Sequence, residues 1–239
     1  MRQVPALDAR PFGIVGNGRV ARHFQHYFSL LGLPVCAWSR RLEASSPPDA
    51  LASCRTVLLL IPDAAIVPFI EAWPALQEKR LVHCSGSLVT PTAEAAHPLM
   101  TFGPELYDLA DYQVIPFVLD AGGTPFAELL PGLPNPTFSI PAADRPYYHT
   151  LCVMAGTFST LLWVKLFDEL QRRFDIPASA AHPCLARVTA NVMADAGRAL
   201  TGPLSRGDTD TIASNLRTLD GDPFQAVYAA FVMAYAQRT

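Results

Sequence analysis

Two glycines near the start of the chain have a spacing that can bind the phosphates of a dinucleotide. The segment Gly16-Asn17-Gly18-Arg19-Val20-Ala21 is a GxGxxA sequence, with the permitted Ala in its last position. The first glycine allows a sharp turn, the second lets the backbone approach a pyrophosphate, and free N–H groups of a following helix face the phosphates. An ordinary glycine turn is the alternative. The position between a predicted strand and a predicted helix favours the dinucleotide site, with residues 16–20 as its cofactor-binding residues.

The residues after the second predicted strand favour NADP(H) over NAD(H). NAD-specific sites usually place Asp or Glu about 20 residues beyond the glycines, where it binds the ribose 2′-hydroxyl. Here that place holds Ser39, Arg40 and Arg41. A serine and two guanidiniums suit a 2′-phosphate, whereas two solvated surface arginines are the alternative. Three residues at the end of the third predicted strand are expected to touch the adenosine and ribose edge of the cofactor: Ile61, Pro62 and Asp63.

Candidate catalytic groups follow the fourth predicted strand. Ser85 and His97 are expected at the carboxyl edge of the sheet, where ligands of open α/β folds bind. A histidine with a pKa near the working pH could donate the proton that completes reduction of a carbonyl or imine; a His-Pro pair that only fixes a loop is the alternative. His149 is expected to face the same cleft. No His, Cys or carboxylate cluster has metal-ligand spacing, so no metal is predicted.

These residues require a sheet that alternates with helices. Short apolar runs at residues 12–15, 35–38, 56–61 and 81–84 are separated by helical patterns at 20–31 and 64–76. This alternation predicts an α/β, Rossmann-type, doubly wound and mostly parallel sheet. Further segments are predicted as a short helical piece at 91–96 and as strands at 114–119 and 137–140, for six or seven strands in all. On the first helix, His23 and His26 are expected to be exposed.

From residue 144 onward no strand pattern returns. Helices are predicted at residues 144–174, 183–200, 209–219 and 223–238. The predicted domains are therefore an NADP-binding Rossmann-like domain over residues 1–143 and a small all-α domain for dimerisation and substrate binding over 144–239. The apolar stretch 147–166 is long enough to span a bilayer, but it contains His149 and Lys165, and no membrane span is expected.

The composition indicates a globular cytoplasmic protein. Half of the residues are hydrophobic and 16% are charged, and the net charge of −3 offers no basic face for nucleic acid or an anionic membrane. The five cysteines are scattered, odd in number and form no CxxC pair, as expected in a reducing compartment. The first dozen residues show no secretory signal.

Several motifs resemble those of short Rossmann-like oxidoreductases whose C-terminal helical part is called domain of unknown function 2520. They are the GxGxxA turn, Ser85-Gly86-Ser87, residues 97–102 (HPLMTF), Tyr148-His149 and residues 200–208 (LTGPLSRGD). The family is similar to pyrroline-5-carboxylate reductases, β-hydroxyacid dehydrogenases and ketopantoate reductases, and its helical domain is similar to the C-terminal domain of 6-phosphogluconate dehydrogenase. The resemblance implies hydride transfer to a small carbonyl or imine and a homodimer formed through the helical domain.

The resemblance also implies that a loop in the helical part binds substrate. In pyrroline-5-carboxylate reductases a comparable Gly- and Thr-rich loop holds a substrate carboxylate and completes the site of the partner subunit. The corresponding candidates here are Gly202, Arg206, Gly207, Thr209 and Thr211. Arg206 is also a candidate catalytic residue. The alternative is an interhelical loop in which Arg206 pairs with Asp208.

One departure limits the resemblance to β-hydroxyacid dehydrogenases. Those enzymes use a lysine a few residues after a glycine pair, with an asparagine one turn later. Here Gly156 is single, Lys165 follows nine residues later and Glu169 stands one turn beyond, so the catalytic lysine is not carried over. The sequence predicts an NADP(H)-dependent reductase of a small carboxylated carbonyl or imine; a catalytically silent dinucleotide-binding or redox-sensing protein is the alternative.

Overall fold

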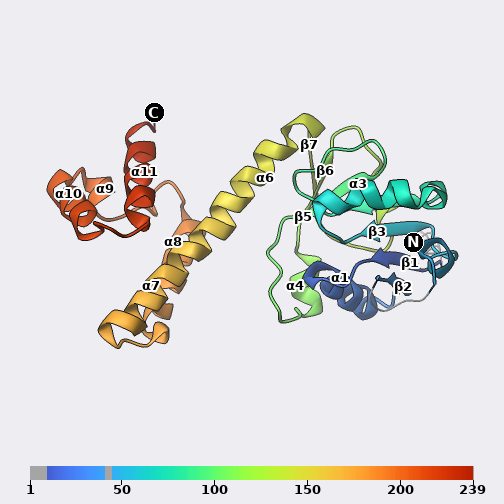
Figure 1. The fold of residues 1–239 in the computed structure, drawn as a ribbon, viewed down its shortest axis with the longest axis horizontal. Coiled ribbons are helices and arrows are strands. Elements are labelled where there is room, and N and C mark those ends of the chain that lie inside the picture. The colour runs from blue at the N-terminus through green and yellow to red at the C-terminus, as the bar shows by residue number, and fades with distance from the viewer. Residues whose placement is uncertain (1–9, 41–44, 239) are drawn as a thin grey trace, which may run out of the picture. The chain divides into compact units, whose positions relative to one another are not determined.

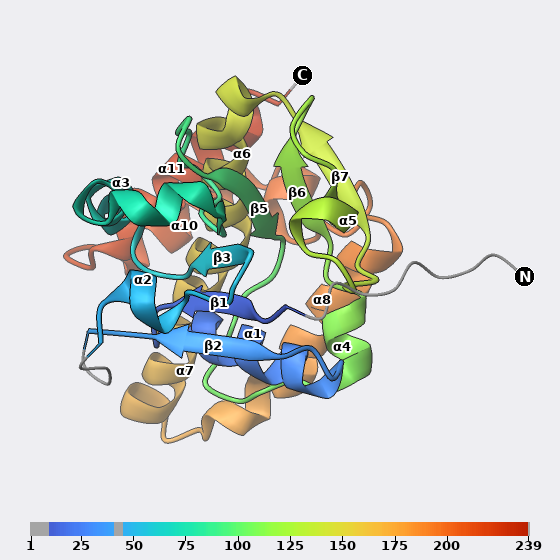
Figure 2. The same ribbon diagram turned by 90° about the vertical axis from the view of Figure 1, so that its right-hand side faces the viewer.

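Seven strands form one sheet in the amino-terminal part of the chain. The computed structural model describes residues 10–40 and 45–238, and the strand order is β2-β1-β3-β4-β5-β6-β7 (Figures 1 and 2). The strands are β1 (Phe12–Val15), β2 (Val35–Trp38), β3 (Thr56–Leu59), β4 (Arg80–His83), β5 (Glu94–Pro98), β6 (Phe117–Asp120) and β7 (Thr137–Ile140). Neighbouring strands are parallel except β5 and β6, which are antiparallel. The predicted doubly wound, mostly parallel sheet is confirmed.

Alternate residues of the central strands face two separate hydrophobic cores. The helices of this part are α1 (Arg19–Leu30), α2 (Pro47–Ala50), α3 (Asp63–Ala72), the 3-10 helix η1 (Pro74–Glu78), α4 (Leu109–Gln113) and α5 (Phe126–Leu129). Ile14 belongs to the same core as Phe28 of α1, whereas Val15 belongs to the core that contains Ile66 of α3. Because both faces are buried, β1 has no polar side chain, and β3 and β4 have apolar residues at consecutive positions rather than alternating ones.

Two element predictions in this part are wrong in detail. Residues 91–96, predicted as helical, contribute instead to β5, which pairs with β4 on one side and β6 on the other. Pairing on both sides satisfies the backbone polar groups of this segment and outweighs its local preference. The strand predicted at 114–119 begins only at Phe117, because Ile115 N–H still donates to the Tyr112 carbonyl at the end of α4 (3.2 Å).

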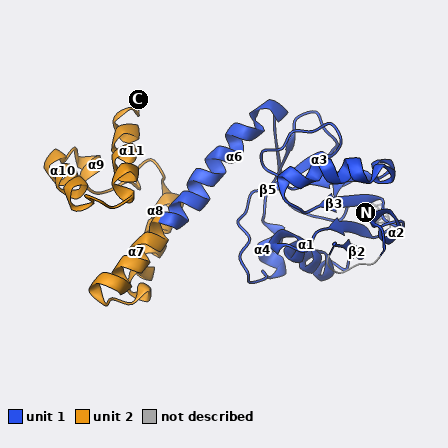
Figure 3. Ribbon diagram, viewed as in Figure 1, with its two compact units in different colours: residues 1–161 blue, residues 162–239 orange. Residues whose placement is uncertain are grey.

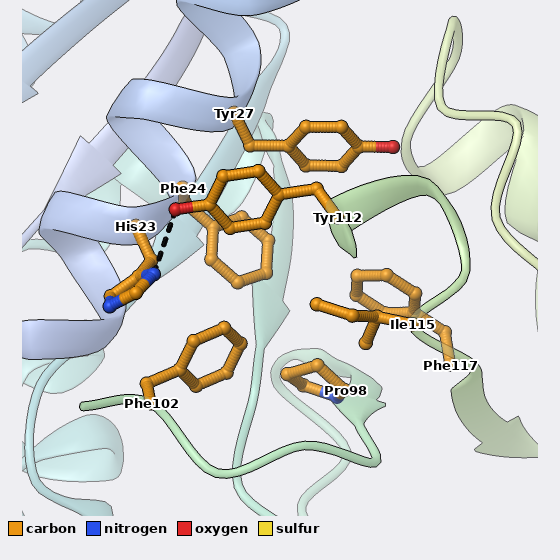
Figure 4. A pocket seen from close by; sticks show the side chains of 8 residues that line it. All are labelled: His23, Phe24, Tyr27, Pro98, Phe102, Tyr112, Ile115 and Phe117. Atoms are coloured by element: carbon orange, nitrogen blue, oxygen red, sulfur yellow. Dashed lines mark hydrogen bonds between the residues drawn. The ribbon is translucent and has the colours of Figure 1, made fainter. Parts of the chain in front are cut away.

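His23 is buried, which corrects the prediction that it is exposed; its side chain is 1% exposed. Its Nε2 lies 3.0 Å from the Gly103 carbonyl oxygen and its Nδ1 lies 2.8 Å from the Tyr112 hydroxyl (Figure 4). Because a carbonyl only accepts, Nε2 carries the hydrogen and Tyr112 donates to Nδ1. The void beside them has a volume of about 10 Å³, which is no larger than one water-sized probe, so we assign it to packing. His26 is half-buried.

A continuous helical stretch follows β7. It comprises the 3-10 helix η2 (Ala142–Asp144), α6 (Arg145–Val153), the π-helical turn η3 (Met154–Phe158) and α7 (Ser159–Phe174). The Ser159 hydroxyl donates to the Ala155 and Gly156 carbonyls within the π-helical turn, at 2.5 and 3.0 Å. By length and composition this stretch could cross a membrane, but a single such helix is weak evidence, and long core helices of soluble proteins pass the same test.

The remaining elements are all helical. They are the 3-10 helix η4 (Ala178–Ala181), α8 (His182–Ala194), α9 (Pro203–Arg206), α10 (Thr209–Thr218) and α11 (Phe224–Ala236). The helix predicted at 183–200 ends at Ala194, because the Asp195 carboxylate accepts the backbone N–H groups of Gly197 and Arg198 (3.0 and 3.3 Å) and closes a turn. The confirmed architecture is therefore a Rossmann-type sheet followed by an all-α part.

The chain divides into two compact units, residues 1–161 and 162–239 (Figure 3). The long helical stretch contributes to both, since the division falls within α7. The predicted domain boundary after residue 143 follows the last strand instead, and it stays a prediction.

Candidate functional site

A cleft of about 400 Å³ lies at the carboxyl ends of β1, β3 and β4. Its walls are the glycine turn, the end of β3 and the start of α3, and the end of β4. The residues that line it are Gly16, Asn17, Gly18, Arg19, Val20, Leu59, Leu60, Ile61, Pro62, Asp63, Cys84 and Ser85. The structure thus brings together the residues predicted from the glycine turn, those predicted from the end of the third strand, and one predicted catalytic residue, Ser85.

The two glycines of the turn have different roles. Gly16 has a φ of +124°, and a Cβ built there would lie 2.2 Å from the Leu60 carbonyl oxygen, so the turn itself requires glycine. At Gly18 φ is −78°, and a built Cβ meets no atom within 4 Å among the described residues. Gly18 is therefore not required by packing, and the space in front of it is open.

The amino end of α1 faces this open space without a side chain that caps it. Gly18 is the N-cap residue, no side chain accepts a hydrogen bond there, and the first turn contains no acidic residue. The first N–H groups of a helix lack partners within the helix, and its dipole favours an anion at this end. This end of α1 can therefore hold a phosphate group.

The end of β2 carries the residues predicted to select NADP(H). The hydroxyl oxygen of Ser39 is buried and has no hydrogen-bond partner among the described residues. A buried hydroxyl without a partner costs about 1–3 kcal/mol, and a phosphate oxygen would supply the missing partner. Arg40 is exposed and follows directly, whereas Arg41 lies outside the described residues. The donor set that the structure describes therefore fits the 2′-phosphate of NADP(H).

Ser85 connects the cleft to a buried network of polar groups. Its hydroxyl donates to Asp63 Oδ2 at 2.5 Å and accepts the backbone N–H of Leu88 at 2.9 Å. Its carbonyl oxygen accepts Nη1 of Arg145 at 3.3 Å. Hydrogen bonds thus fix the position of both the backbone and the side chain of Ser85.

Arg145, which the sequence analysis did not single out, is fully buried at the start of α6. Its Nε pairs with the Asp120 carboxylate, and its Nη2 donates to the Val118 carbonyl at 3.0 Å. The guanidinium therefore joins the first turn of α6 to the ends of β4 and β6. A lone arginine at the start of a very apolar helix was the only signal in the sequence that could have indicated this role.

His97 and His149, both predicted near the cleft, lie on either side of Gly86. A Cβ built on Gly86 would lie 2.3 Å from His149 Nδ1 and 3.0 Å from His97 Nε2. The His97 Nδ1 lies 2.8 Å from the Tyr148 hydroxyl. His149 Nδ1 is buried and has no hydrogen-bond partner among the described residues. Tyr148, quoted above only as part of a motif, thus belongs to this cluster.

Burial and nearby positive charge change the proton affinities of this cluster. Burial, together with His149 and Arg145, lowers the pKa of His97 to about 4. Burial and Arg145 lower the pKa of His83 to about 4 as well, whereas burial raises the pKa of Tyr148 above its ordinary value. At neutral pH His97 is therefore a neutral imidazole, because its pKa lies well below the unperturbed value. Its catalytic role stays a prediction.

In the carboxy-terminal unit, Lys165 is held by two carboxylates. Its Nζ lies 2.6 Å from Asp222 Oδ2 and 2.9 Å from Glu169 Oε1. These hydrogen bonds, the one to Asp222 first, raise the pKa of Lys165. Lys165 therefore forms two ion pairs, which agrees with a structural role for this side chain.

The predicted substrate loop is built around α9 and the start of α10. Gly202 and Gly207 have φ values of +92° and +66°, which favour glycine. The Asp208 carboxylate caps α10 by accepting the backbone N–H of Thr211 at 3.0 Å and its hydroxyl at 2.8 Å. Asp208 thus satisfies an N–H group that was expected to be free for substrate, and over the described residues it pairs with Thr211 rather than with Arg206. The substrate role of Gly202, Arg206, Gly207, Thr209 and Thr211 stays a prediction.

The helical part of the chain matches a known protein family. Residues 121–234 match the family described as Domain of unknown function (DUF2520). The match covers slightly less than half of the chain. No curated protein sequence matches this chain. Over the described residues, no group of three His, Cys, Asp or Glu side chains could hold a metal ion.

Solved structures share the fold of this chain. A protein of Bacteroides fragilis, BF3122, which is named as an NADP oxidoreductase, has a TM-score of 0.77 at 21% identity, over 96% of this chain and 98% of that chain. TM1727 of Thermotoga maritima has a TM-score of 0.66 at 21% identity, over 95% and 97%. A reductive aminase of Aspergillus terreus, in complex with NADPH and ethyl levulinate, has a TM-score of 0.60 at 14% identity, over 93% and 87%. At these identities the likeness establishes the fold.

Proposed function

We propose that this protein is an NADP(H)-dependent reductase of a small carbonyl or imine compound that carries a carboxylate. The observation that carries the proposal is the cleft in front of α1, which remains open at Gly18 and is bordered by Ser85. Ligands of open α/β sheets bind at this carboxyl edge. The related fold of the Aspergillus terreus reductive aminase, which binds NADPH and ethyl levulinate, supports the same class of chemistry.

Three groups of residues, two of them in the cleft and one at the end of β2, would hold the cofactor. The turn from Gly16 to Val20 would hold the pyrophosphate, Ser39 with Arg40 and Arg41 would hold the 2′-phosphate, and residues 61–63 would line the adenosine and ribose edge. When bound, a reduced nicotinamide supplies a hydride. The protein would contribute orientation and polar groups around the reacting carbonyl or imine.

The proposal names two separate sets of candidate substrate residues, one in each unit. Ser85, His97 and His149 lie next to one another at the end of β4 and would surround the reacting group. Arg206, with its fixed positive charge, and the Gly202–Thr211 loop would bind the substrate carboxylate.

A cofactor-binding measurement tests the proposal. We expect NADPH to bind more tightly than NADH, because only NADPH carries the 2′-phosphate. Arg40→Gln combined with Arg41→Gln should weaken NADPH binding at least about tenfold and leave NADH binding within about twofold. Arg22→Gln, which removes an exposed arginine from α1, is the matched control. Equal losses for both cofactors would contradict the assigned role of the two arginines.

A turnover screen tests the enzymatic half of the proposal. Purified protein with NADPH is offered keto acids, imino acids and aldehydes, and oxidation of NADPH is followed by its absorbance. Arg206→Ala should impair turnover of carboxylated substrates and leave NADPH affinity within about twofold. Loss of NADPH binding in Arg206→Ala would show that the two roles are not separate.

We propose that the protein works as a cytoplasmic homodimer formed through its helical part. In the carboxy-terminal unit, large apolar side chains are exposed on several helices: Phe174, Val192, Met193, Phe231 and Met233. Exposed apolar surface of this kind favours association. Light scattering after gel filtration should give twice the chain mass. Met193→Glu should shift this mass toward the monomer, whereas Arg173→Glu on α7 should leave it unchanged.

A catalytically silent dinucleotide-binding or redox-sensing protein is the second candidate. The absence of the lysine that β-hydroxyacid dehydrogenases use in catalysis favours it, and Lys165 is instead paired with Asp222 and Glu169. NADPH binding without any NADPH oxidation across the screen would support this candidate over the reductase.

A further inference from the structure

A cluster of polar side chains lies outside the cofactor cleft, where the first turns of α6 lie against the end of β4. Arg145 fixes the start of this helix through the Ser85 and Val118 carbonyls and the Asp120 carboxylate. Residues three and four positions later lie on the same face of a helix. The clamp at Arg145 therefore directs Tyr148 and His149 toward Ser85, Gly86 and His97, and both the hydrogen bond of Tyr148 and the approach of His149 to Gly86 follow from it.

We propose that Tyr148 is a positioning residue, which holds His97 as the tautomer with hydrogen on Nε2 and thereby makes His97 a hydrogen-bond donor toward the reacting carbonyl or imine. The inference rests on the proposed reductase function and adds to it the group that prepares His97. The geometry has three parts: the Tyr148–His97 contact, the direction of Nε2, and the position of Gly86 beside the cleft wall.

The Tyr148 hydroxyl decides which ring nitrogen of His97 carries the hydrogen. The His97 Nδ1 lies 2.8 Å from this hydroxyl, and the Cys152 thiol, a weak acceptor, is another side chain that bonds to it. A phenol at neutral pH always has a hydrogen to donate, and the raised pKa of Tyr148 keeps it there. A neutral imidazole can accept on only one nitrogen. The pairing is best satisfied when Tyr148 donates to Nδ1, which leaves the hydrogen on Nε2.

The Nε2 side of His97 faces Gly86. A Cβ on Gly86 would lie 3.0 Å from Nε2, so the absence of a side chain at Gly86 is what allows the imidazole to come this close. Gly86 follows Ser85, which lines the cleft. The Nε2–H group of His97 is therefore placed one residue from the wall of the cofactor cleft.

A neutral histidine suits this role. The groups that act on His97 are Tyr148 and His149 of α6, Arg145 at the start of α6, His83 of β4 and Asp63 of α3. Burial and the two cationic or imidazole neighbours on α6 keep His97 uncharged at neutral pH. An uncharged imidazole N–H can polarise a carbonyl oxygen, as a neutral histidine does in other enzymes. The low proton affinity of His97 thus fits a donor of a hydrogen bond rather than a donor of a proton.

Nitrogen-15 NMR of histidine-labelled protein tests the inference without any substrate. We expect His97 to carry hydrogen on Nε2 in the wild type and to become a mixture of both tautomers in Tyr148→Phe. Tyr147→Phe, which alters the exposed neighbouring tyrosine, is the matched control and should leave the His97 tautomer unchanged. Hydrogen on Nδ1 in the wild type, or an unchanged tautomer in Tyr148→Phe, would overturn the assignment.

Kinetics separate positioning from a structural role. With a substrate returned by the NADPH turnover screen, Tyr148→Phe should lower kcat at least about tenfold and leave NADPH affinity and KM within about twofold. His97→Gln keeps an N–H group near the Nε2 position and should retain more activity than His97→Asn, even if Tyr148→Phe folds poorly. Equal activity of these two His97 variants would overturn the donor role of Nε2. Absence of NADPH binding in the wild type would instead refute the proposed function, while the tautomer would still be measurable.

Discussion

The two compact units of this chain differ in how many of their side chains are buried. The amino-terminal unit contains nearly all of the buried side chains, in two cores on opposite faces of the sheet. In the described part of the carboxy-terminal unit, by contrast, only Ala181 is buried, although its helices carry many large apolar residues. The cofactor cleft therefore lies in a unit whose own packing fixes it, whereas the predicted substrate loop lies in a unit whose apolar surface is uncovered.

Because of this difference, we expect single substitutions to destabilise the amino-terminal unit more than the carboxy-terminal unit. The interior of the amino-terminal unit is closely packed, so even one added methyl group there contacts neighbouring side chains or carbonyls. In the helical unit most side chains are exposed, and a substitution removes only local interactions.

Substitution of the two glycines of the cofactor turn should have opposite consequences. Gly16→Ala places a Cβ against the Leu60 carbonyl at a positive φ, so the free energy of unfolding should fall by more than about 3 kcal/mol. Gly18→Ala meets no neighbour and should cost less than about 1 kcal/mol, yet reduce NADPH affinity at least about tenfold. Urea unfolding and NADPH titration measure both. A stable Gly16→Ala protein would show that the turn is not tightly packed.

Loss of a buried ion pair should be far more damaging than loss of an exposed one. Arg145→Met leaves Asp120 and two carbonyls without their donor, and we expect a loss of about 3–5 kcal/mol in the free energy of unfolding. Arg172→Met on α7 removes a pair with Glu169 from a side chain that is 72% exposed, and because solvent screens this pair the loss should be barely measurable. Similar losses for both variants would remove the contrast between the units.

Acid should destabilise the amino-terminal unit through its buried histidines. The pKa values of His83 and His97 are about 4 in the folded chain and near 6.5 when unfolded, so the unfolded chain takes up protons first as the pH falls. The free energy of unfolding should be constant above pH 6.5 and fall between pH 6.5 and 4, by up to about 1.4 kcal/mol per pH unit for each histidine. Thermal unfolding against pH measures this. His83→Leu should make the slope shallower, and an unchanged slope would exclude His83 as its source.

The smallest effect is expected at the cap of α10. Asp208→Ala removes the acceptor for the Thr211 N–H and hydroxyl and should cost about 1 kcal/mol. Asp210→Ala, in the first turn of the same helix, is the control and should cost less, because it removes no cap. A larger loss for Asp210→Ala would argue against Asp208 as the capping residue.

Local sequence patterns were sufficient for the elements that position the cofactor cleft. The strands at residues 12–15 and 35–38 agree with their predicted bounds, because short apolar runs next to glycine or proline are typical of strands, and the largely exposed strand at 137–140 agrees as well. The cleft residues Gly16 and Asp63 were found from a turn pattern and from a strand end. Features that depend on distant partners were not found: β5 needs strands on both sides, and His23 is buried by the distant Tyr112.

The polar cluster behind Ser85 also depends on contacts between residues that are distant in the sequence. Ser85, His97 and His149 could be selected from their places after predicted strands and at a helix start. Arg145 and Tyr148 acquire their roles only when residues 25 to 60 positions away come into contact with them. A sequence pattern carries no record of such contacts, so the neutral state of His97 could not be predicted either.

The central claim is that a dinucleotide phosphate binds at the open amino end of α1. Calorimetric titration of the purified wild-type protein with NADPH, and in parallel with NADH, tests it most directly. We expect saturable binding of one NADPH per chain, tighter than that of NADH, and a loss of NADPH binding in Gly18→Ala without unfolding. No binding of either nucleotide to the folded wild-type protein would contradict it.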